Sequence, residues 1–113
     1  MIKIRIETNL GKLDYLDKSI QNAISTGLQK AGFAIERDAK LFAPVKTGRL
    51  RASINTQKLT DLKISVQDGV LYGVYNELGT RYMNPHPFLL PAFEKNKLMI
   101  PRLVQEEINK ILR

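Results

Sequence analysis

The residues that usually carry catalysis or bind metals are scarce in this chain. It contains one histidine, His86, and no cysteine. Without cysteine there is no disulfide framework, no thiolate metal site and no cysteine nucleophile, and this composition fits a reducing compartment. A single histidine excludes multi-histidine metal centres and leaves little general acid–base capacity near neutral pH. We therefore expect a protein that is not an enzyme and that has no catalytic residue, no metal and no cofactor.

Three other patterns could do chemistry, and each has a simpler interpretation. Glu77 and His86 fall in one predicted loop and could share a metal or serve a small hydrolase, but two ligands do not make a metal site. Glu106 and Glu107 are adjacent on a predicted helix, where neighbouring side chains diverge by roughly 100°. The Lys-Thr-Gly tripeptide at 46–48 occurs without the other motifs of penicillin-interacting serine enzymes. We expect all of these to be ordinary structural or surface residues.

The charge balance points to an acidic partner. The chain has 18 Lys and Arg against 11 Asp and Glu, which gives a net charge of +7. Such an excess suggests nucleic acid, although a solvated surface alone also accounts for it. The candidates for a DNA-facing patch that contacts the backbone are Lys46, Arg49, Arg51 and Lys58. No aromatic residues are interleaved with them and no helix-turn-helix or zinc-finger pattern occurs, so we expect no base reading.

The N-terminal half is predicted to form a strand and a long helix. At 113 residues the chain should be a single domain spanning 1–113. Isoleucines alternate with charged residues over 2–7, which is typical of a strand and unlike the apolar run of a signal peptide. Apolar residues recur every three or four positions over 13–42, which predicts a helix ended by Ala43-Pro44. Gly27 and Gly32 mark either a bend in that helix or the close approach of another backbone.

The C-terminal half is predicted to contain three strands and a second helix. Alternation predicts strands over 50–56 and 62–66, and Asp68-Gly69 is typical of a hairpin turn. The run 70–75 would then be a third strand, apolar on both faces and therefore central or interfacial. An irregular loop should follow over 76–87.

A helical period returns at Phe88. Pro91 suits the first turn of this helix, whereas Pro101 predicts a kink or break near 99–100. The resulting order, β-α-β-β-β-α, indicates an α+β fold: a small antiparallel sheet packed by a long N-terminal helix and a C-terminal helix. No stretch approaches the roughly 20 apolar residues of a membrane span.

Apolar residues exceed what one small core requires. Tyr72, Tyr75, Tyr82 and Phe88 crowd a 17-residue stretch. These side chains either fill the core or form an interface between subunits, where tyrosine and phenylalanine are enriched.

Three segments together resemble a known family. They are AKLFAPVKTGRLRASI at 39–54, YGVYNELGT at 72–80 and MNPHPFLLPAF at 83–93. Their types, spacing and order are similar to those of the minor tail-component proteins of tailed bacteriophages, and the likeness spans about residues 10–113. Two positions depart from the family pattern. Gly73 replaces the commoner alanine, and Leu90 stands where a basic residue is frequent, which argues against an anion contact at that helix start.

The resemblance implies a structural protein of a phage or prophage, described as a head–tail joining, neck or tail-completion protein, with a fold like that of tail terminators. It implies a homo-oligomeric ring of six copies, or of twelve on the connector side, with head-connector and tail proteins as partners. The expected location is the head–tail junction of the virion, and the host cytoplasm during assembly. The alternative is a small basic nucleic-acid-binding module. The residues assigned to the motifs or an interface are Pro44, Thr47, Gly48, Arg49, Arg51, Tyr72, Tyr75, Glu77, Gly79, Thr80, Pro87, Phe88 and Pro91.

Two pairs of motif residues are expected to shape turns. Gly48 and Gly79 should adopt backbone conformations that a Cβ atom would penalise. The hydroxyl groups of Thr47 and Thr80 should brace those turns.

Glu77 is expected to form an ion pair, within one subunit or between two, and the candidate partners are Arg49, Arg51 and Arg81. A ring needs two different patches on each subunit, and the long helix and the doubly apolar third strand are the natural candidates. Six copies would bring a summed charge of roughly +42 around DNA that passes through without being read.

Overall fold

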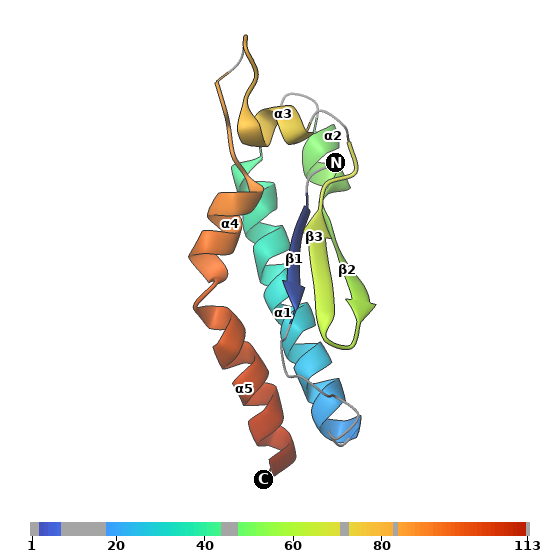
Figure 1. The fold of residues 1–113 in the computed structure, drawn as a ribbon. Helices are drawn as coiled ribbons and strands as arrows, with labels where there is room; N and C mark the ends of the chain where they lie inside the picture. The colour runs from blue at the N-terminus through green and yellow to red at the C-terminus, as the bar shows by residue number, and fades with distance from the viewer. Residues whose placement is uncertain (1–2, 8–17, 44–47, 71–72, 83, 113) are drawn as a thin grey trace.

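The computed structural model describes residues 3–7, 18–43, 48–70, 73–82 and 84–112. These residues form an elongated α+β molecule with extents of 53 × 22 × 20 Å (Figure 1). The elements in chain order are β1 (Lys3–Glu7), α1 (Lys18–Phe42), α2 (Arg49–Ser53), β2 (Asn55–Thr60), β3 (Lys63–Gln67), α3 (Gly73–Leu78), α4 (Leu89–Asn96) and α5 (Met99–Leu112). The predicted fold class, a small antiparallel sheet with a long N-terminal helix and a C-terminal helix, is confirmed.

The sheet has the order β1-β3-β2, and both pairs are antiparallel. β2 and β3 form a hairpin around Asp61 and Leu62, and a bulge lies between Lys58 and Thr60 in β2. The predicted strands at 2–7 and 62–66 correspond to β1 and β3. β1 lies near the N-terminus, far from β3 in the sequence, and it pairs with β3 at the edge of the sheet opposite β2.

Helix α1 packs on the sheet and on the C-terminal helices. Its buried face carries the periodic small and apolar residues that predicted it, Ile24, Leu28, Ala31, Ile35 and Ala39. Residues 13–17 of the predicted helix lie outside the described residues. In the described parts of the chain, no helix is both long enough and apolar enough to cross a bilayer.

The predicted strand over 50–56 is wrong in its first half, because residues 49–53 form α2. Gly48 precedes this helix with φ of 74°, and the Ala52 N–H donates to the Gly48 carbonyl at 2.9 Å. The Ser53 hydroxyl donates to the Leu50 carbonyl at 2.7 Å, which closes the turn. Over so short a segment, a buried Leu50 fits the two-residue period of a strand and the 3.6-residue period of a helix equally. Alternation alone therefore did not reveal the helix.

The predicted third strand over 70–75 is also wrong. Residues 71 and 72 lie outside the described residues, but Gly73–Leu78 form helix α3. A short apolar run cannot be assigned to strand or helix by its period. Asp68-Gly69 therefore leads from β3 toward α3 instead of turning a hairpin. The described residues of this segment therefore do not form the doubly apolar strand that was a candidate for a ring interface.

The two C-terminal helices are separated as Pro101 predicted. α4 ends at Asn96 and α5 begins at Met99, so the break lies at 97–98, two residues before the predicted point. Pro91 and Pro101 are each the third residue of their helix, in the first turn, where a missing N–H costs nothing.

Glycines in α1 mark close contacts with other elements. A Cβ atom on Gly27 would lie 2.6 Å from the Cα of Val104 in α5, and one on Gly32 would lie 2.6 Å from Cγ2 of Thr56 in β2. Of the two predicted roles, the close approach of another backbone is therefore confirmed for Gly27, whereas Gly32 is packed against the side chains of Thr56 and Ile64.

Replacing Gly27 with alanine should lower the free energy of unfolding by about 1–3 kcal/mol, because the methyl group would meet the backbone of α5 and force the helices apart. Urea unfolding followed by circular dichroism measures this loss. Asn22→Ala, on the exposed face of the same helix, serves as the control and should change stability by less than about 0.5 kcal/mol. Equal stability of Gly27→Ala and the wild type would contradict the described contact.

Candidate functional site

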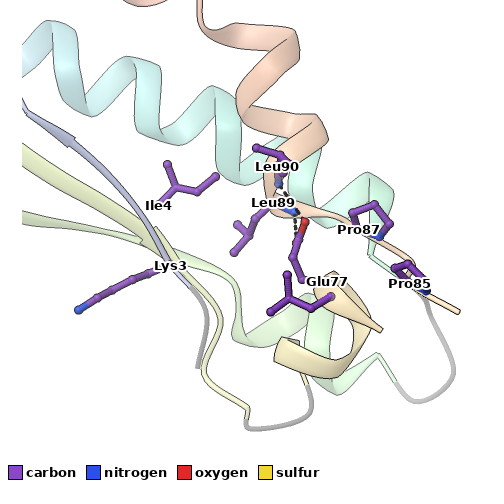
Figure 2. Close-up of a pocket in the computed structure, with 8 residues that line it drawn as sticks. Lys3, Ile4, Glu77, Pro85, Pro87, Leu89 and Leu90 are labelled. Carbon is purple, nitrogen blue, oxygen red and sulfur yellow. Dashed lines mark hydrogen bonds between the residues drawn. The ribbon is translucent and has the colours of Figure 1, made fainter. Parts of the chain in front are cut away.

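Glu77 is a buried carboxylate that caps the start of helix α4. Its Oε1 accepts hydrogen bonds from the backbone N–H groups of Phe88 (3.1 Å) and Leu89 (2.8 Å), and its Oε2 accepts one from Leu90 (3.3 Å) (Figure 2). The first N–H groups of a helix lack partners within it, and a negative charge is favourable at that end. We call this arrangement the Glu77 cap. It ties α3 to α4 across the loop between them.

The loop that returns from α3 to α4 is shaped by two of the predicted motif residues. Gly79 ends α3 with φ of 77°, and its N–H donates to the Tyr75 carbonyl at 2.8 Å. The Thr80 hydroxyl accepts a hydrogen bond from the Tyr82 N–H at 3.2 Å. The turn roles predicted for Gly79 and Thr80 are thus confirmed, as is the positive φ of Gly48. Thr47 lies outside the described residues.

The predicted ion pair of Glu77 with an arginine is not formed within one subunit in the described part of the chain, and a pair between two subunits stays a prediction. Its three hydrogen bonds occupy the carboxylate with backbone amides, and the Arg81 guanidinium instead lies over the Tyr82 ring at 5.8 Å from the centroid. The residue before α4 offered a signal that sequence reasoning missed. Phe88 occupies the N-cap position and has no side-chain acceptor, so this helix needs an acceptor from elsewhere in the chain.

A second buried carboxylate holds the other end of α4. Asp38 of α1 accepts a hydrogen bond from the side-chain amide of Asn96, the last residue of α4, at 2.7 Å. Burial raises the pKa of Asp38, but the hydrogen bond from Asn96 and the nearby cations Arg37 and Lys95 outweigh it and hold that pKa below its usual value. α4 is therefore fixed on α1 at one end and on α3 at the other.

Replacing Asp38 with asparagine should destabilise the protein in a pH-dependent way. Because the folded-state pKa of Asp38 is lowered, its charge stabilises the fold fully above the unfolded pKa of about 3.9 and loses this effect as pH falls through the folded value. The stability gap between wild type and Asp38→Asn should be constant near neutral pH and shrink below about pH 4. Urea unfolding at several pH values measures it. Asp61→Asn, a half-exposed carboxylate paired with Lys58, is the control, and a gap that does not depend on pH would contradict the assignment.

An apolar groove lies beside the Glu77 cap. Its volume is about 490 Å³, and Figure 2 shows that its wall comes from β1, α3, the following loop and the start of α4. The residues that line it are Lys3, Ile4, Glu77, Leu78, Pro85, Pro87, Leu89 and Leu90. We call it the α3–α4 groove. Leu78 is 68% exposed and Leu90 is 56% exposed at its rim, so the groove suits apolar side chains of another molecule.

The groove offers no recognisable catalytic chemistry. Its carboxylate is engaged by three backbone amides, and His86 is exposed. Across the described ranges of the chain, no three histidine, aspartate or glutamate side chains gather where they could bind a metal ion. The arrangement is suited to holding α3 and α4 in fixed positions relative to each other, with the apolar groove between them.

The other predicted site residues are distributed over the same end of the molecule. Phe88 is fully buried below the cap, Pro87 lines the groove, Pro91 is half-buried in α4 and Tyr75 is exposed on α3. Pro44 and Tyr72 lie outside the described residues. The structure thus brings the second and third motif segments together, while Lys3, Ile4, Leu78 and Leu89 are groove residues that sequence reasoning missed.

Of the four residues predicted to face DNA, the structure describes Arg49, Arg51 and Lys58, and these three are not gathered on one surface. Arg49 and Arg51 lie two positions apart on α2, and such positions point to different sides of a helix. Lys58 lies toward the hairpin end of β2, away from α2 (Figure 1), and pairs with Asp61 at 3.0 Å. Lys46 lies outside the described residues.

Comparison with known proteins gives one match. A family model described as "Bacteriophage HK97-gp10, putative tail-component" matches residues 5–79. The match runs from β1 to the end of α3 and includes the first of the three motif segments and all but the last residue of the second. Neither the curated proteins nor the solved structures compared with the chain gave a match.

Proposed function

The chain belongs to the HK97 gp10-like family of bacteriophage tail components, and from this premise we propose that it acts at the head–tail junction as a neck or tail-completion protein. It is a structural protein of a phage or prophage virion. In our proposal it is made in the host cytoplasm and joins the virion during assembly, with no catalytic step of its own. Its partners there are further copies of itself and the connector and tail proteins on either side.

The observation that carries the proposal is the exposure of large apolar side chains on two separate surfaces. One is the α3–α4 groove, with Leu78 and Leu90 at its rim. The other is the outer face of α1, where Phe33 and Leu41 are exposed eight residues apart and so lie on one side of the helix. On α1 the exposed Arg37 lies between these two side chains, so each of them offers a separate apolar contact to a partner.

Two different patches on one subunit are what a ring requires. In a heterologous contact, one surface of a subunit meets a different surface of the next subunit. The subunits form a ring when the rotation from each copy to the next brings the last copy back to the first. We propose that the α3–α4 groove of one copy receives the outer face of α1 of the next copy. A ring of six copies matches the tail symmetry that the family resemblance implies, and a ring of twelve applies on the connector side.

The location is tested by electron microscopy of virions labelled with an antibody against this chain. The proposal predicts label at the junction between head and tail. It also predicts that a phage lacking the gene accumulates separate heads and tails, and that the wild-type gene supplied in trans restores joined particles. Label along the tail tube or at the distal tip, or complete virions that lack the protein, would overturn the proposal.

A further inference from the structure

One face of the sheet is covered by helices and the other is not. Thr56 of β2 donates to the Gly32 carbonyl of α1, and Ile64 of β3 also meets Gly32, so these residues mark the covered face. Because neighbouring residues in a strand point to opposite faces, the residues between them lie on the other side. Figure 2 shows this directly at β1, where Ile4 points toward α4 and Lys3 points away from it.

The pairing register assigns the residues of the uncovered face. Lys3, Gln67 and Asn55 lie in one row across the three strands, Arg5, Ser65 and Gln57 in the next, and Glu7, Lys63 and Thr60 in the third. We call these nine residues the open sheet face. None of the helices that the structure describes packs on it, since α1 and α4 both lie on the side of Ile4, Ile64 and Thr56.

The open sheet face is entirely polar and carries more positive than negative charge. It has three cations, five neutral polar side chains and a single carboxylate, Glu7, which pairs with Lys63 at 3.3 Å. Protein interfaces have apolar and aromatic centres, and this face has neither. Phosphate and sugar contacts in DNA complexes come from Lys, Arg, Ser, Asn and Gln side chains. The composition therefore favours a polyanionic partner over a protein.

Ser65 adds an independent observation at the centre of this face. It is 1% exposed, and its hydroxyl oxygen has no hydrogen-bond partner among the described residues. A buried hydroxyl without a partner costs about 1–3 kcal/mol, so such groups call for an explanation. In the register Ser65 lies between Arg5 and Gln57. Because this hydroxyl is buried, a phosphate oxygen held by the Arg5 guanidinium would accept its hydrogen bond only after the neighbouring side chains move aside.

We propose that the open sheet face binds the phosphate backbone of duplex DNA without reading its sequence, through Lys3, Arg5 and the hydroxyl of Ser65. The absence of aromatic residues from this face fits contact with the backbone instead of stacking on bases. The biological setting rests on the proposed function, in which this face lines the DNA passage of a ring. The contact surface itself belongs to a single subunit.

The test is fluorescence anisotropy of a labelled duplex of random sequence, titrated with the purified full-length chain over about 50–200 mM salt, where phosphate contacts lose strength. Each neutralised phosphate contact contributes about 0.9 to the slope of log affinity against log salt concentration. Arg5→Gln should therefore reduce the slope by about 0.9, and Lys3→Gln/Arg5→Gln by about 1.8.

Two controls separate a specific surface from a general effect of charge. Lys97→Gln/Arg102→Gln removes the same charge from exposed positions around the start of α5 and should leave the slope at the wild-type value. Ser65→Ala should weaken binding by a few fold with an unchanged slope, and it should not lower thermal stability, because it removes an unpaired buried hydroxyl.

An equal loss of slope in both double variants, or no salt-dependent binding by the wild type, would overturn this inference. The outcome is independent of the proposed function. A chain that binds DNA through this face but is absent from virions contradicts only the proposed function. A virion protein whose DNA binding is unchanged in Lys3→Gln/Arg5→Gln contradicts only the inference about the sheet.

Discussion

Replacing Glu77 with alanine should lower the free energy of unfolding by about 3 kcal/mol, because it leaves three backbone N–H groups at the buried start of α4 without an acceptor. Glu77→Gln should cost less, since the amide keeps one acceptor oxygen but loses the charge that suits a helix N-terminus. Urea unfolding followed by circular dichroism measures both losses.

The matched control for Glu77 is Glu94→Gln, which neutralises an exposed carboxylate within α4 and should change stability by less than about 0.5 kcal/mol. A hydrogen-exchange experiment locates the effect. The amides of Leu89 and Leu90 should exchange faster in Glu77→Gln than in the wild type. If Glu77→Ala is as stable as Glu94→Gln, the carboxylate does not cap α4.

Replacing Leu78 and Leu90 together with glutamine should weaken self-association by about tenfold or more and leave the fold intact. Both side chains are more than half exposed in the monomer, so their polar replacement costs little stability. Burying each leucine against a neighbouring subunit is worth on the order of 1 kcal/mol. Glutamine is preferable to a charged residue because it leaves the electrostatics of the Glu77 cap unchanged.

Leu98→Gln is the control for these two leucines. Leu98 is 79% exposed but lies between α4 and α5, outside the α3–α4 groove. Its replacement should leave self-association at the wild-type level. Equal weakening by Leu98→Gln would mean that general surface hydrophobicity, and not the groove, drives the contact.

Periodicity predicted the long elements and failed on the short ones. Helix α1 presents an apolar residue at every turn for most of its length, and β1 alternates without interruption, so both could be predicted from the sequence. α2 and α3 have only five and six residues. Over so few positions, the spacing of Leu50 or Val74 satisfies a strand and a helix equally, and the turns beside them decide the outcome.

Some residues of the candidate site were predicted from the sequence, but the geometry of the site was not. Glu77, Gly79 and Phe88 were singled out from the motif segments, and the structure brings them together. The partners of Glu77 within the subunit were not predicted, because a carboxylate among arginines suggests an ion pair, while the backbone amides that it binds carry no sequence signal. The groove and the open sheet face both depend on β1 pairing with β3, a contact between distant segments that local patterns do not specify.

The motif segments therefore describe how the subunit is built near the α3–α4 groove. Gly79 turns the chain after α3, the Glu77 cap fixes α4, and Asp38 holds the far end of that helix. Together they keep the rim of the α3–α4 groove in a defined shape before any partner arrives. A preorganised surface of this kind reduces the entropy cost of assembly.

The central claim is that this chain assembles with itself through the α3–α4 groove. Sedimentation velocity of the purified full-length chain over a range of concentrations tests it most directly. The account predicts a concentration-dependent shift from monomer to a single closed species of six or twelve copies, and the loss of that species in Leu78→Gln/Leu90→Gln. A wild-type chain that remains monomeric at every concentration, or a double variant that assembles like the wild type, would contradict it.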